Sequence, residues 1–199
     1  MIYEDGLAVQ TLQLRGVDVQ FIGDPAILEQ PLLGLFCSQK CPGKLIIEAF
    51  DLAKELRDQR VPVISGFHSS IEKEMLHIFM RGTQPIVICL AREMKGYSIP
   101  IEYKTLLNEG RLLLISPFFG KKFTRITKNA AVVRNQIVGL FSTLILLVHA
   151  EPGGSIDQLS QKWVVDNKEV FGLQGSTNQY LFERGVKVWE INTWVSHNR

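Results

Sequence analysis

The sequence predicts an α/β fold in which helices cover both faces of a mainly parallel sheet, and three observations support this prediction. Short apolar runs alternate with amphipathic segments along most of the chain. Several runs, such as Leu33–Ser38, lack polar alternation, which is typical of strands buried on both faces. Most of the runs end in loops rich in serine and glycine. Strands separated by helices of this length form parallel sheets with right-handed crossovers.

The first strand–helix–strand unit occupies residues 33–65. Leu33–Ser38 is its first strand, and Pro42 and Gly43 mark the loop that follows. Lys44–Arg60 carries apolar residues at helical spacing with charges between them, and Val61–Ser65 is the second strand.

The alternation of predicted strands and helices continues to the end of the chain. Gly82 follows an amphipathic segment and is a plausible helix stop. Thr143–His149 is the most hydrophobic strand, so we expect it to be the central one. The further predicted helices are Ile71–Arg81, Pro100–Asn108, Val132–Phe141, Ile156–Asp166 and Thr177–Arg184. The further predicted strands are Pro85–Ala91, Leu112–Ser116, Thr143–His149, Val170–Leu173 and Val186–Ile191.

Residues 1–30 do not show this alternation of strands and helices. We expect them to form an N-terminal hairpin or extension, with a short helix at Pro25–Glu29, beside one larger unit at residues 31–199.

Composition indicates an ordinary globular domain. Of 199 residues, 46% are hydrophobic and 21% charged, and the formal net charge of +2 gives no strong sign of nucleic-acid binding. The N-terminus lacks the pattern of a secretory signal, and the apolar segment Ile137–Ala150 is too short to span a bilayer. Cys37, Cys41 and Cys89 are an odd set without metal-ligand spacing. We therefore expect a cytoplasmic protein with reduced thiols, no metal and no membrane partner.

The most informative stretch runs from Arg134 to Ser155. It combines a polar helix start, an apolar strand and a Gly-Gly-Ser turn that opens another helix. Such a turn presents backbone N–H groups to an anion, usually a phosphate. Gly153, Gly154 and Ser155 are thus predicted to bind phosphate, and the alternative is an ordinary turn with Ser155 as a helix cap.

Other polar loops follow predicted strands, at the edge of the sheet where ligands bind in open α/β folds. Ser65 and Gly66, followed by Ser69 and Ser70, form a second candidate anion cradle, with plain helix capping as the alternative. The first predicted strand is followed by three more candidates, Ser38, Gln39 and Lys40.

Cationic side chains provide further candidates. Arg134, next to Asn135 in a predicted helix, could clamp a phosphate through its guanidinium or form a surface ion pair. Lys121, Lys122 and Arg125 are interleaved with phenylalanines, a composition that suits single-stranded nucleic acid or a solvated loop with core anchors.

No residue is predicted to be catalytic. No G-x-S-x-G marks Ser65 or Ser155 as a nucleophile, and the absence of G-x-G-x-x-G and Walker A patterns argues against a standard dinucleotide or P-loop site. His68 and His77 are not spaced for a metal, and we expect His149 to be structural.

Five segments have the order and spacing of a known family's motifs. LGLFCSQ stands where the family has VAIVGSR, SGFHSSIE where it has SGLARGID, and RNQIVGLFS where it has RNRIIAGLS. ILLVHAEPGGS matches VLVVEA and its Gly-Ser-rich turn, and GSTNQYLFERGV matches a late G-x-N-x-L-I-x-x-G-A. From about Phe21 to Val188 the chain therefore resembles the nucleotide-binding domain of the DNA-processing protein A family (DprA, also called Smf).

The resemblance implies an extended Rossmann-like fold with three αβα layers, related to the LOG and lysine-decarboxylase-like nucleotide-binding proteins. It implies that residues 31–199 bind single-stranded DNA or a nucleotide, with no cofactor beyond a bound nucleotide or phosphate. It further implies a homodimer and a recombinase partner in DNA recombination during natural transformation.

Three basic positions of the family motifs are neutral in this chain. Gln39, Ser69 and Gln136 stand where the family has arginine, which predicts fewer phosphate contacts and a weaker salt dependence of DNA binding.

Two alternatives remain open. LOG-type phosphoribohydrolases carry PGGxGTxxE, and here Ile156, Asp157 and Ser160 stand at its Gly, Thr and Glu positions. Cleavage of a nucleotide needs a carboxylate at the ribose, for which Asp157, and less favourably Glu151, is the candidate. The second alternative is a dimerisation scaffold whose binding site is degenerate.

Overall fold

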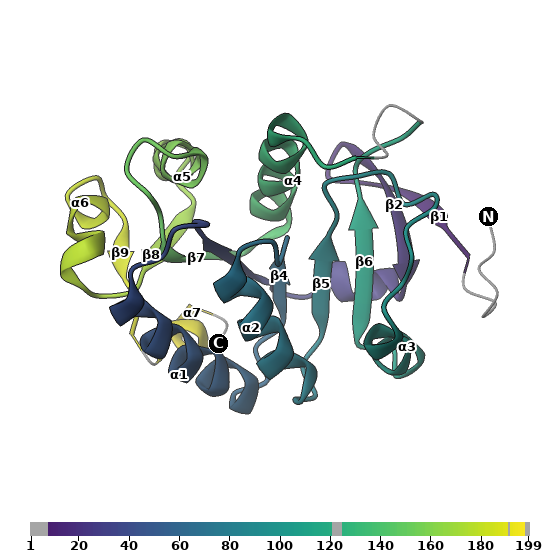
Figure 1. Cartoon of the computed structure of the whole chain (residues 1–199), viewed down its shortest axis with the longest axis horizontal. Helices are drawn as coiled ribbons and strands as arrows, with labels where there is room; N and C mark the ends of the chain where they lie inside the picture. The colour runs from purple at the N-terminus through teal and green to yellow at the C-terminus, as the bar shows by residue number, and fades with distance from the viewer. Residues whose placement is uncertain (1–7, 121–124, 191, 198–199) are drawn as a thin grey trace.

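The computed structural model describes residues 8–120, 125–190 and 192–197. These residues form one nine-stranded sheet in the order β1-β2-β6-β5-β4-β3-β7-β8-β9, with helices on both faces (Figure 1). The strands are β1 (Gln10–Leu14), β2 (Val17–Gly23), β3 (Leu33–Cys37), β4 (Val63–Ser65), β5 (Ile86–Cys89), β6 (Leu112–Ser116), β7 (Leu144–His149), β8 (Glu169–Gly172) and β9 (Lys187–Val188). The α-helices are α1 (Gly43–Asp58), α2 (Ser70–Met80), α3 (Ile101–Asn108), α4 (Lys128–Phe141), α5 (Ser155–Val165), α6 (Gln179–Phe182) and α7 (Thr193–His197), and the 3-10 helices include η1 (Pro25–Glu29) and η3 (Ser176–Asn178).

The sheet is mainly parallel, as predicted. Strands β3 to β9 pair in parallel, whereas β1 and β2 form an antiparallel hairpin whose second strand pairs with β6, with Phe21 opposite Ile115. The expected N-terminal hairpin and short helix are thus present, and the hairpin continues the sheet at one edge. The extended Rossmann-like αβα fold class is confirmed.

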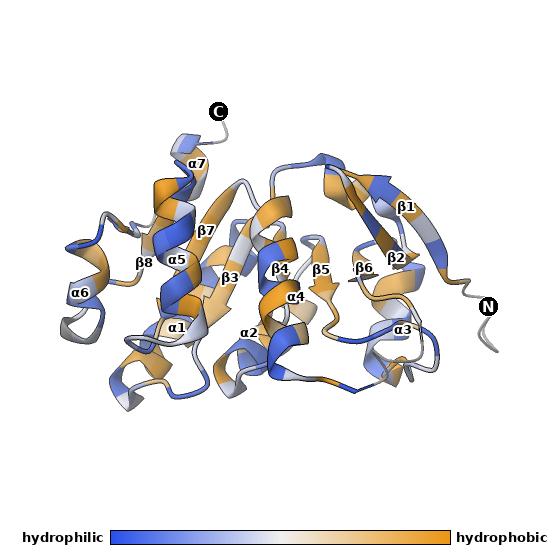
Figure 2. Ribbon diagram, turned by 90° about the horizontal axis from the view of Figure 1, so that it is seen from above, coloured by the Kyte–Doolittle hydropathy of each residue, from blue (hydrophilic) through white to orange (hydrophobic). Residues whose placement is uncertain are grey.

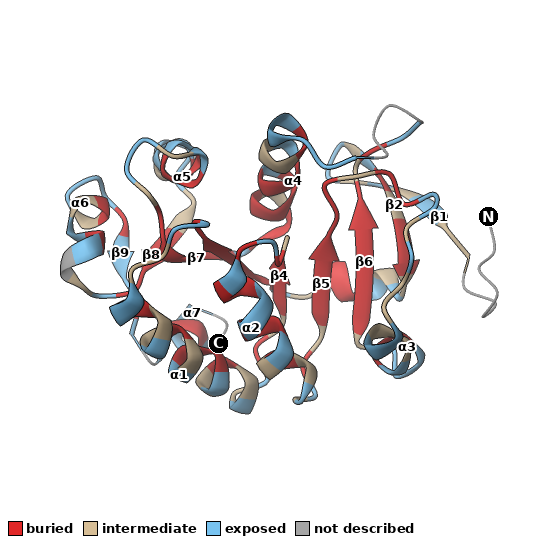
Figure 3. Ribbon diagram, in the orientation of Figure 1, coloured by how far each residue is buried: buried red, intermediate tan, exposed pale blue. Residues whose placement is uncertain are grey.

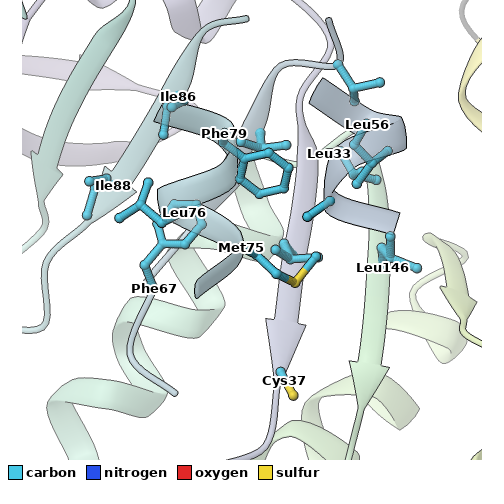
Figure 4. Close-up of a cluster of buried hydrophobic side chains, with 14 of the residues drawn as sticks. Leu33, Cys37, Leu56, Phe67, Met75, Leu76, Phe79, Ile86, Ile88 and Leu146 are labelled. Carbon is cyan, nitrogen blue, oxygen red and sulfur yellow. The ribbon is translucent and has the colours of Figure 1, made fainter. Parts of the chain in front are cut away.

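Two apolar cores lie on opposite faces of the sheet. Along β3, Leu33 and Leu35 belong to the core under α1, α2, α3 and α7, whereas Phe36 belongs to the core under α4, α5 and α6. Met75 and Phe79 of α2 pack in the first core (Figure 4). The inner strands are buried while the helices keep an exposed outer face (Figure 3). The helices alternate polar and apolar residues accordingly (Figure 2). This two-sided burial explains why the strands lack polar alternation in the sequence.

The strand order reverses between β3 and β7. From β3 the chain builds the sheet through β4, β5 and β6 in one direction, and from β7 through β8 and β9 in the other. The helices that follow β3 and β7, α1 and α5, lie on opposite faces (Figure 1). The loops after these two strands therefore diverge and leave a crevice, the usual ligand position in open α/β sheets. A register shift in the β3–β7 pair falls at Phe36 and Cys37, next to this crevice.

The prediction that Thr143–His149 is the central strand is wrong. β7 lies between β3 and β8, and β4 occupies the centre of the sheet. Every inner strand of a covered parallel sheet is apolar, so hydrophobicity separates inner strands from edges but does not rank the inner ones.

The helices differ from expectation at three places. α4 begins at Lys128, four residues before the predicted start, because the Thr127 side chain caps it by accepting a hydrogen bond from the Ala130 N–H at 3.1 Å. The predicted helix Thr177–Arg184 is divided into η3 and the short α6, and α7 was not predicted. No helix among the described residues is long and apolar enough to cross a membrane.

Candidate functional site

A cavity of about 860 Å³ opens at the carboxyl ends of β3, β4 and β7. Its walls come from the loop after β3, the start of α2, one face of α4, and the loop after β7 with the start of α5. It therefore lies at the reversal of strand order. The lining residues used below are Cys37, Ser38, Gln39, His68, Ser69, Ser70, Glu72, Lys73, Ile126, Lys128, Ala131, Val132, Arg134, Asn135, Glu151, Gly154, Ser155 and Ile156.

Arg134 is the central cation of this cavity. Its side chain lines the cavity while the residue is only 6% exposed. Its Nε and Nη2 donate to Oδ1 of Asn135 at 3.0 and 2.9 Å. Within the described part of the chain, no carboxylate lies within the 4.0 Å of an ion pair with Arg134. A buried cation without a direct ion pair is costly, so a bound anion would stabilise it.

Glycine at position 66 makes room for this guanidinium. A Cβ atom on Gly66 would lie 2.3 Å from both Cζ and Nε of Arg134. The β4–α2 loop therefore supports Arg134 by close backbone approach, although Gly66 itself does not line the cavity.

Glu72 fills the gap between the loops that follow β3 and β4. Its Oε1 accepts a hydrogen bond from the Cys37 N–H at 2.8 Å, and its Oε2 accepts from the His68 and Ser69 N–H groups at 2.7 and 3.0 Å. Burial raises the pKa of Glu72, and these hydrogen bonds and the charge of Arg134 oppose the rise. The Ser69 side chain returns a bond by accepting from the Glu72 N–H at 3.2 Å, which completes a capping box.

Most backbone N–H groups of the Gly-Gly-Ser turn after β7 already donate hydrogen bonds to acceptors within the chain. The Gly153 N–H donates to Oδ2 of Asp157 at 2.8 Å, and the Gly154 N–H donates to the carbonyl of Glu151 at 2.8 Å. Gly153 has φ +73°, which favours glycine. Within the described residues the N–H groups of Ser155, Ile156 and Asp157 have no acceptor, and Ser155 and Ile156 are the two of these residues that line the cavity.

The structure brings together eight of the predicted site residues. These eight, which line the cavity, are Ser38, Gln39, Ser69, Ser70, Arg134, Asn135, Gly154 and Ser155. Four others, which do not line it, are Lys40, Ser65, Gly66 and Gly153. Three possible DNA contacts were also predicted: Lys121 and Lys122 fall outside the described residues, and Arg125 is exposed beside the lining residue Ile126.

Several of the predicted residues serve to join loops. Oγ of Ser38 accepts a hydrogen bond from the Glu151 N–H at 2.8 Å, which ties the β3 loop to the β7 loop. Nζ of Lys40 lies 3.5 Å from Oε1 of Glu151, an exposed ion pair at the same junction. Oγ of Ser65 accepts from the Phe67 N–H at 3.1 Å and shapes the β4–α2 loop.

Sequence reasoning missed two lysines of the cavity, Lys73 and Lys128, which are both exposed. Lys128, Ala131, Val132 and Asn135 follow one another at helical spacing on the face of α4 that lines the cavity. Placing the start of α4 correctly would have revealed Lys128. Lys73 follows Ser70 by one turn of α2, and that spacing was its signal.

Glu72 was also missed as a lining residue, as was His68. Burial lowers the pKa of His68, and the charges of Arg134 and Lys73 act in the same direction. The imidazole is therefore neutral at neutral pH, and the positive charge of the cavity comes from the arginine and the lysines.

The carboxylate proposed for nucleotide cleavage, Asp157, does not line the cavity. Nη1 of Arg184 donates to both of its oxygens, at 2.9 and 3.1 Å, and Gln161 also donates to it. Burial acts to raise the pKa of Asp157, but the hydrogen bonds from Gly153, Gln161 and Arg184 outweigh burial and lower it. Asp157 therefore stabilises the turn after β7 from a position outside the cavity lining.

His149 has a structural environment. Its Nδ1 lies 2.9 Å from Oδ1 of the fully buried Asn178, whose amide donates to the carbonyls of Val148 and Leu173 at 3.0 Å each. This network ties β7 to the segment after β8. Among the described residues, no group of three or more histidine, cysteine, aspartate or glutamate side chains could hold a metal ion.

Comparisons with known proteins identify the fold. No family model and no curated protein sequence matches the chain. Its structure is similar to DNA processing protein A from Streptococcus pneumoniae, with a TM-score of 0.72, 15% identity, and coverage of 87% of this chain and 63% of that one. This chain thus spans less than two thirds of that protein.

A second similar structure covers nearly the whole of both chains. It is DNA processing protein A from Helicobacter pylori, described for its single-stranded DNA binding mode, with a TM-score of 0.74, 14% identity, and coverage of 98% of this chain and 97% of that one.

The fold is also similar to that of the molybdenum cofactor carrier protein from Chlamydomonas reinhardtii. The TM-score is 0.56 at 14% identity, with coverage of 84% of this chain and 95% of that one. At these identities the likenesses show a shared fold.

Proposed function

We propose that this protein is a DprA-like binding protein that holds a phosphate of single-stranded DNA, or of a nucleotide, against Arg134. The observation that carries the proposal is the buried guanidinium of Arg134, which lines an open cavity and has no ion pair among the described residues. A phosphate supplies the missing negative charge and accepts the bidentate hydrogen bonds that arginine offers.

The surroundings of Arg134 favour a polynucleotide. Lys73 on α2 and Lys128 on α4 are exposed residues of two different walls of the cavity, where they can contact phosphates on either side of the one held by Arg134. These lysines provide positive charge in a cavity where Gln39 and Ser69 are neutral at family arginine positions. The Helicobacter pylori neighbour, which binds single-stranded DNA, supports the same ligand class.

Binding without hydrolysis is the activity we propose. Cleavage at a ribose needs a carboxylate free to act there. Asp157 is held outside the cavity by Gly153 and Arg184, and Glu72 is committed to three backbone N–H groups. Glu151 is the more exposed carboxylate of the cavity, and it pairs with Lys40. Incubation with nucleoside monophosphates should release no free base, and release that depends on Glu151 would support the phosphoribohydrolase alternative.

Fluorescence anisotropy with labelled oligo-dT tests the proposal. The wild-type protein should bind, and Arg134→Ala should lose about 1.5–3 kcal/mol of binding free energy, the range for a charge-assisted hydrogen bond. Lys54→Ala is the matched control, because Lys54 is an exposed cation on α1 that pairs with Asp51 and does not line the cavity. Equal affinity of wild type and Arg134→Ala would contradict the proposal.

Competition with unlabelled nucleoside monophosphates separates the two ligand sizes. Weak displacement of oligo-dT would support a DNA ligand, and tight binding of a monophosphate without oligo-dT binding would support a small nucleotide. A folded dimer that binds neither would support the scaffold alternative. The homodimer, the recombinase partner and a role in recombination are parts of the same proposal, which sedimentation and pull-down with a recombinase address.

A further inference from the structure

Two of the three cysteines flank the loop that connects β3 to α1. Cys37 is the last residue of β3 and lines the cavity, and Cys41 lies just before the start of α1. Cys37 is buried in the core under α1, α2, α3 and α7 (Figure 4), and Cys41 packs against the same core from a half-exposed position. Cys89 belongs to the core on the opposite face of the sheet. The wall of the cavity therefore contains one buried thiol and one accessible thiol.

The thiols of Cys37 and Cys41 form a hydrogen-bonded pair in which their reactivities differ. The hydrogen bond from the Cys37 thiol lowers the pKa of Cys41, although the partial burial of Cys41 acts in the opposite direction. The same hydrogen bond raises the pKa of Cys37, and burial adds to the rise. The N-terminus of α1, which begins at Gly43, also favours a negative charge nearby. Cys41 is therefore the thiol that ionises first and can be reached from solvent, and these are the two properties of a reactive cysteine.

The loop between the two cysteines is part of the ligand surface. Ser38 and Gln39 line the cavity, and Oγ of Ser38 accepts a hydrogen bond from the Glu151 N–H at 2.8 Å. Within the described part of the chain the Gln39 N–H has no acceptor, so it can donate to an anion in the cavity. A disulfide joins its sulfurs at about 2.05 Å, which is shorter than any hydrogen bond between thiols. Closing the bond must draw Cys41 toward Cys37 and turn the loop that carries Gln39.

We propose that Cys37 and Cys41 form a reversible disulfide when the protein meets a low-molecular-weight disulfide such as oxidised glutathione, and that this bond weakens anion binding in the cavity by moving Gln39. The Cys41 thiolate attacks one sulfur of oxidised glutathione, forms a mixed disulfide and releases one glutathione thiolate. Cys37 then loses its proton and attacks the Cys41 sulfur, which releases the second glutathione. Two protein thiols are oxidised, one glutathione disulfide is reduced to two thiols, and the two protons pass through solvent to the departing glutathiones. The effect on binding rests on the function proposed above.

Peptide mapping after incubation with oxidised glutathione tests whether the disulfide forms. Trypsin cleaves after Lys40, so the two cysteines lie on the separate peptides 16–40 and 41–44. In wild type these peptides should stay joined until dithiothreitol is added. Cys37→Ala should instead accumulate glutathione on Cys41, because the second thiol is missing. Cys41→Ala should gain little glutathione, because Cys37 is buried.

Anisotropy with labelled oligo-dT, before and after the same oxidation, tests the effect on binding. Oxidised wild type should bind about fivefold more weakly, which corresponds to about 1 kcal/mol, the contribution of one hydrogen bond. Dithiothreitol should restore the affinity. Cys41→Ala should have the same affinity with and without oxidised glutathione, because it cannot form the bond. Cys89→Ala is the matched control: burial on β5 raises the pKa of Cys89 to about 12, so this variant should respond to oxidation as wild type does.

The outcomes separate the inference from the proposed function. Separate peptides in oxidised wild type would overturn the inference, and so would joined peptides with unchanged oligo-dT affinity. An equal loss of affinity in treated Cys41→Ala would also overturn it, since the effect would not come from the cysteine pair. Reduced wild type that binds no oligo-dT would overturn the proposed function, and the peptide map would still show whether the disulfide forms. If Cys37→Ala does not fold, as judged by circular dichroism, the results for wild type and Cys41→Ala decide.

Discussion

The guanidinium of Arg134 lies against the backbone of Gly66, so closely that a Cβ atom at Gly66 would come within 2.3 Å of Cζ. The contact joins α4 to the β4–α2 loop, and the same loop supplies the His68 and Ser69 N–H groups to Glu72. The position of the buried cation and that of the buried carboxylate are therefore set by one loop.

Arg134→Met should weaken oligo-dT binding about as much as Arg134→Ala does, without lowering stability. Methionine keeps much of the side-chain volume and removes a buried charge that has no ion pair among the described residues, so the free energy of unfolding should stay the same or rise. Urea denaturation measures stability, and anisotropy measures binding. A large loss of stability would instead mean that Arg134 holds the fold together.

Gly66→Ala should reduce oligo-dT affinity about as much as Arg134→Ala does. The added methyl group displaces the guanidinium, which is the far end of a flexible side chain, so the main loss should be in binding. Gly43→Ala serves as the control, because a Cβ atom there meets nothing within 4 Å and Gly43 opens α1. Retention of full affinity in folded Gly66→Ala would show that the position of Arg134 does not matter for binding.

Lys73→Ala and Lys128→Ala should each flatten the salt dependence of oligo-dT binding. Each phosphate contact in a single strand contributes about 0.7 to the slope of log affinity against log salt concentration, so each variant should lower the slope by about 0.7. The double variant should lower it by about twice as much. Anisotropy titrations at several salt concentrations give the slopes, and slopes equal to wild type would remove both lysines from the DNA path.

Asp157 should stabilise the protein at neutral pH and lose this contribution in acid. Its pKa is lowered in the folded state, so the stabilisation is present above the ordinary value of 3.8 and is lost as pH falls through the lower folded value. Asp157→Asn should therefore be less stable than wild type near neutral pH, and the difference should narrow below the ordinary value. Urea denaturation over this range measures it, and a difference independent of pH would contradict the assignment.

The fold could be predicted because burial on both faces leaves a plain sequence signal. β3, β6 and β7 are uninterrupted apolar runs, and amphipathic segments separate most of the strands. The start of α4 was less visible, because its first turn has no strong apolar periodicity and depends on the Thr127 cap. The order of the inner strands depends on which strands pair, and that is a tertiary property.

The candidate site could be predicted in position and only partly in chemistry. The rule that ligands bind at strand carboxyl ends brought Ser38, Ser69 and Arg134 to one cavity. The sequence did not show that Glu72 and Asp157 would take the N–H groups of the two cradles, since acidic residues in a first helical turn are ordinary. A carboxylate that binds a loop 35 residues away can be recognised only when the loops are placed in space.

The most direct test of the account is the proton–nitrogen NMR signal of the Arg134 side chain, assigned through Arg134→Lys, during titration with oligo-dT and then with dTMP. The Nε–H resonance of Arg134 should shift in a saturable manner with both ligands, together with the backbone resonances of Ser155 and Ile156. Saturable binding that leaves these resonances in place and shifts those of another surface would contradict it.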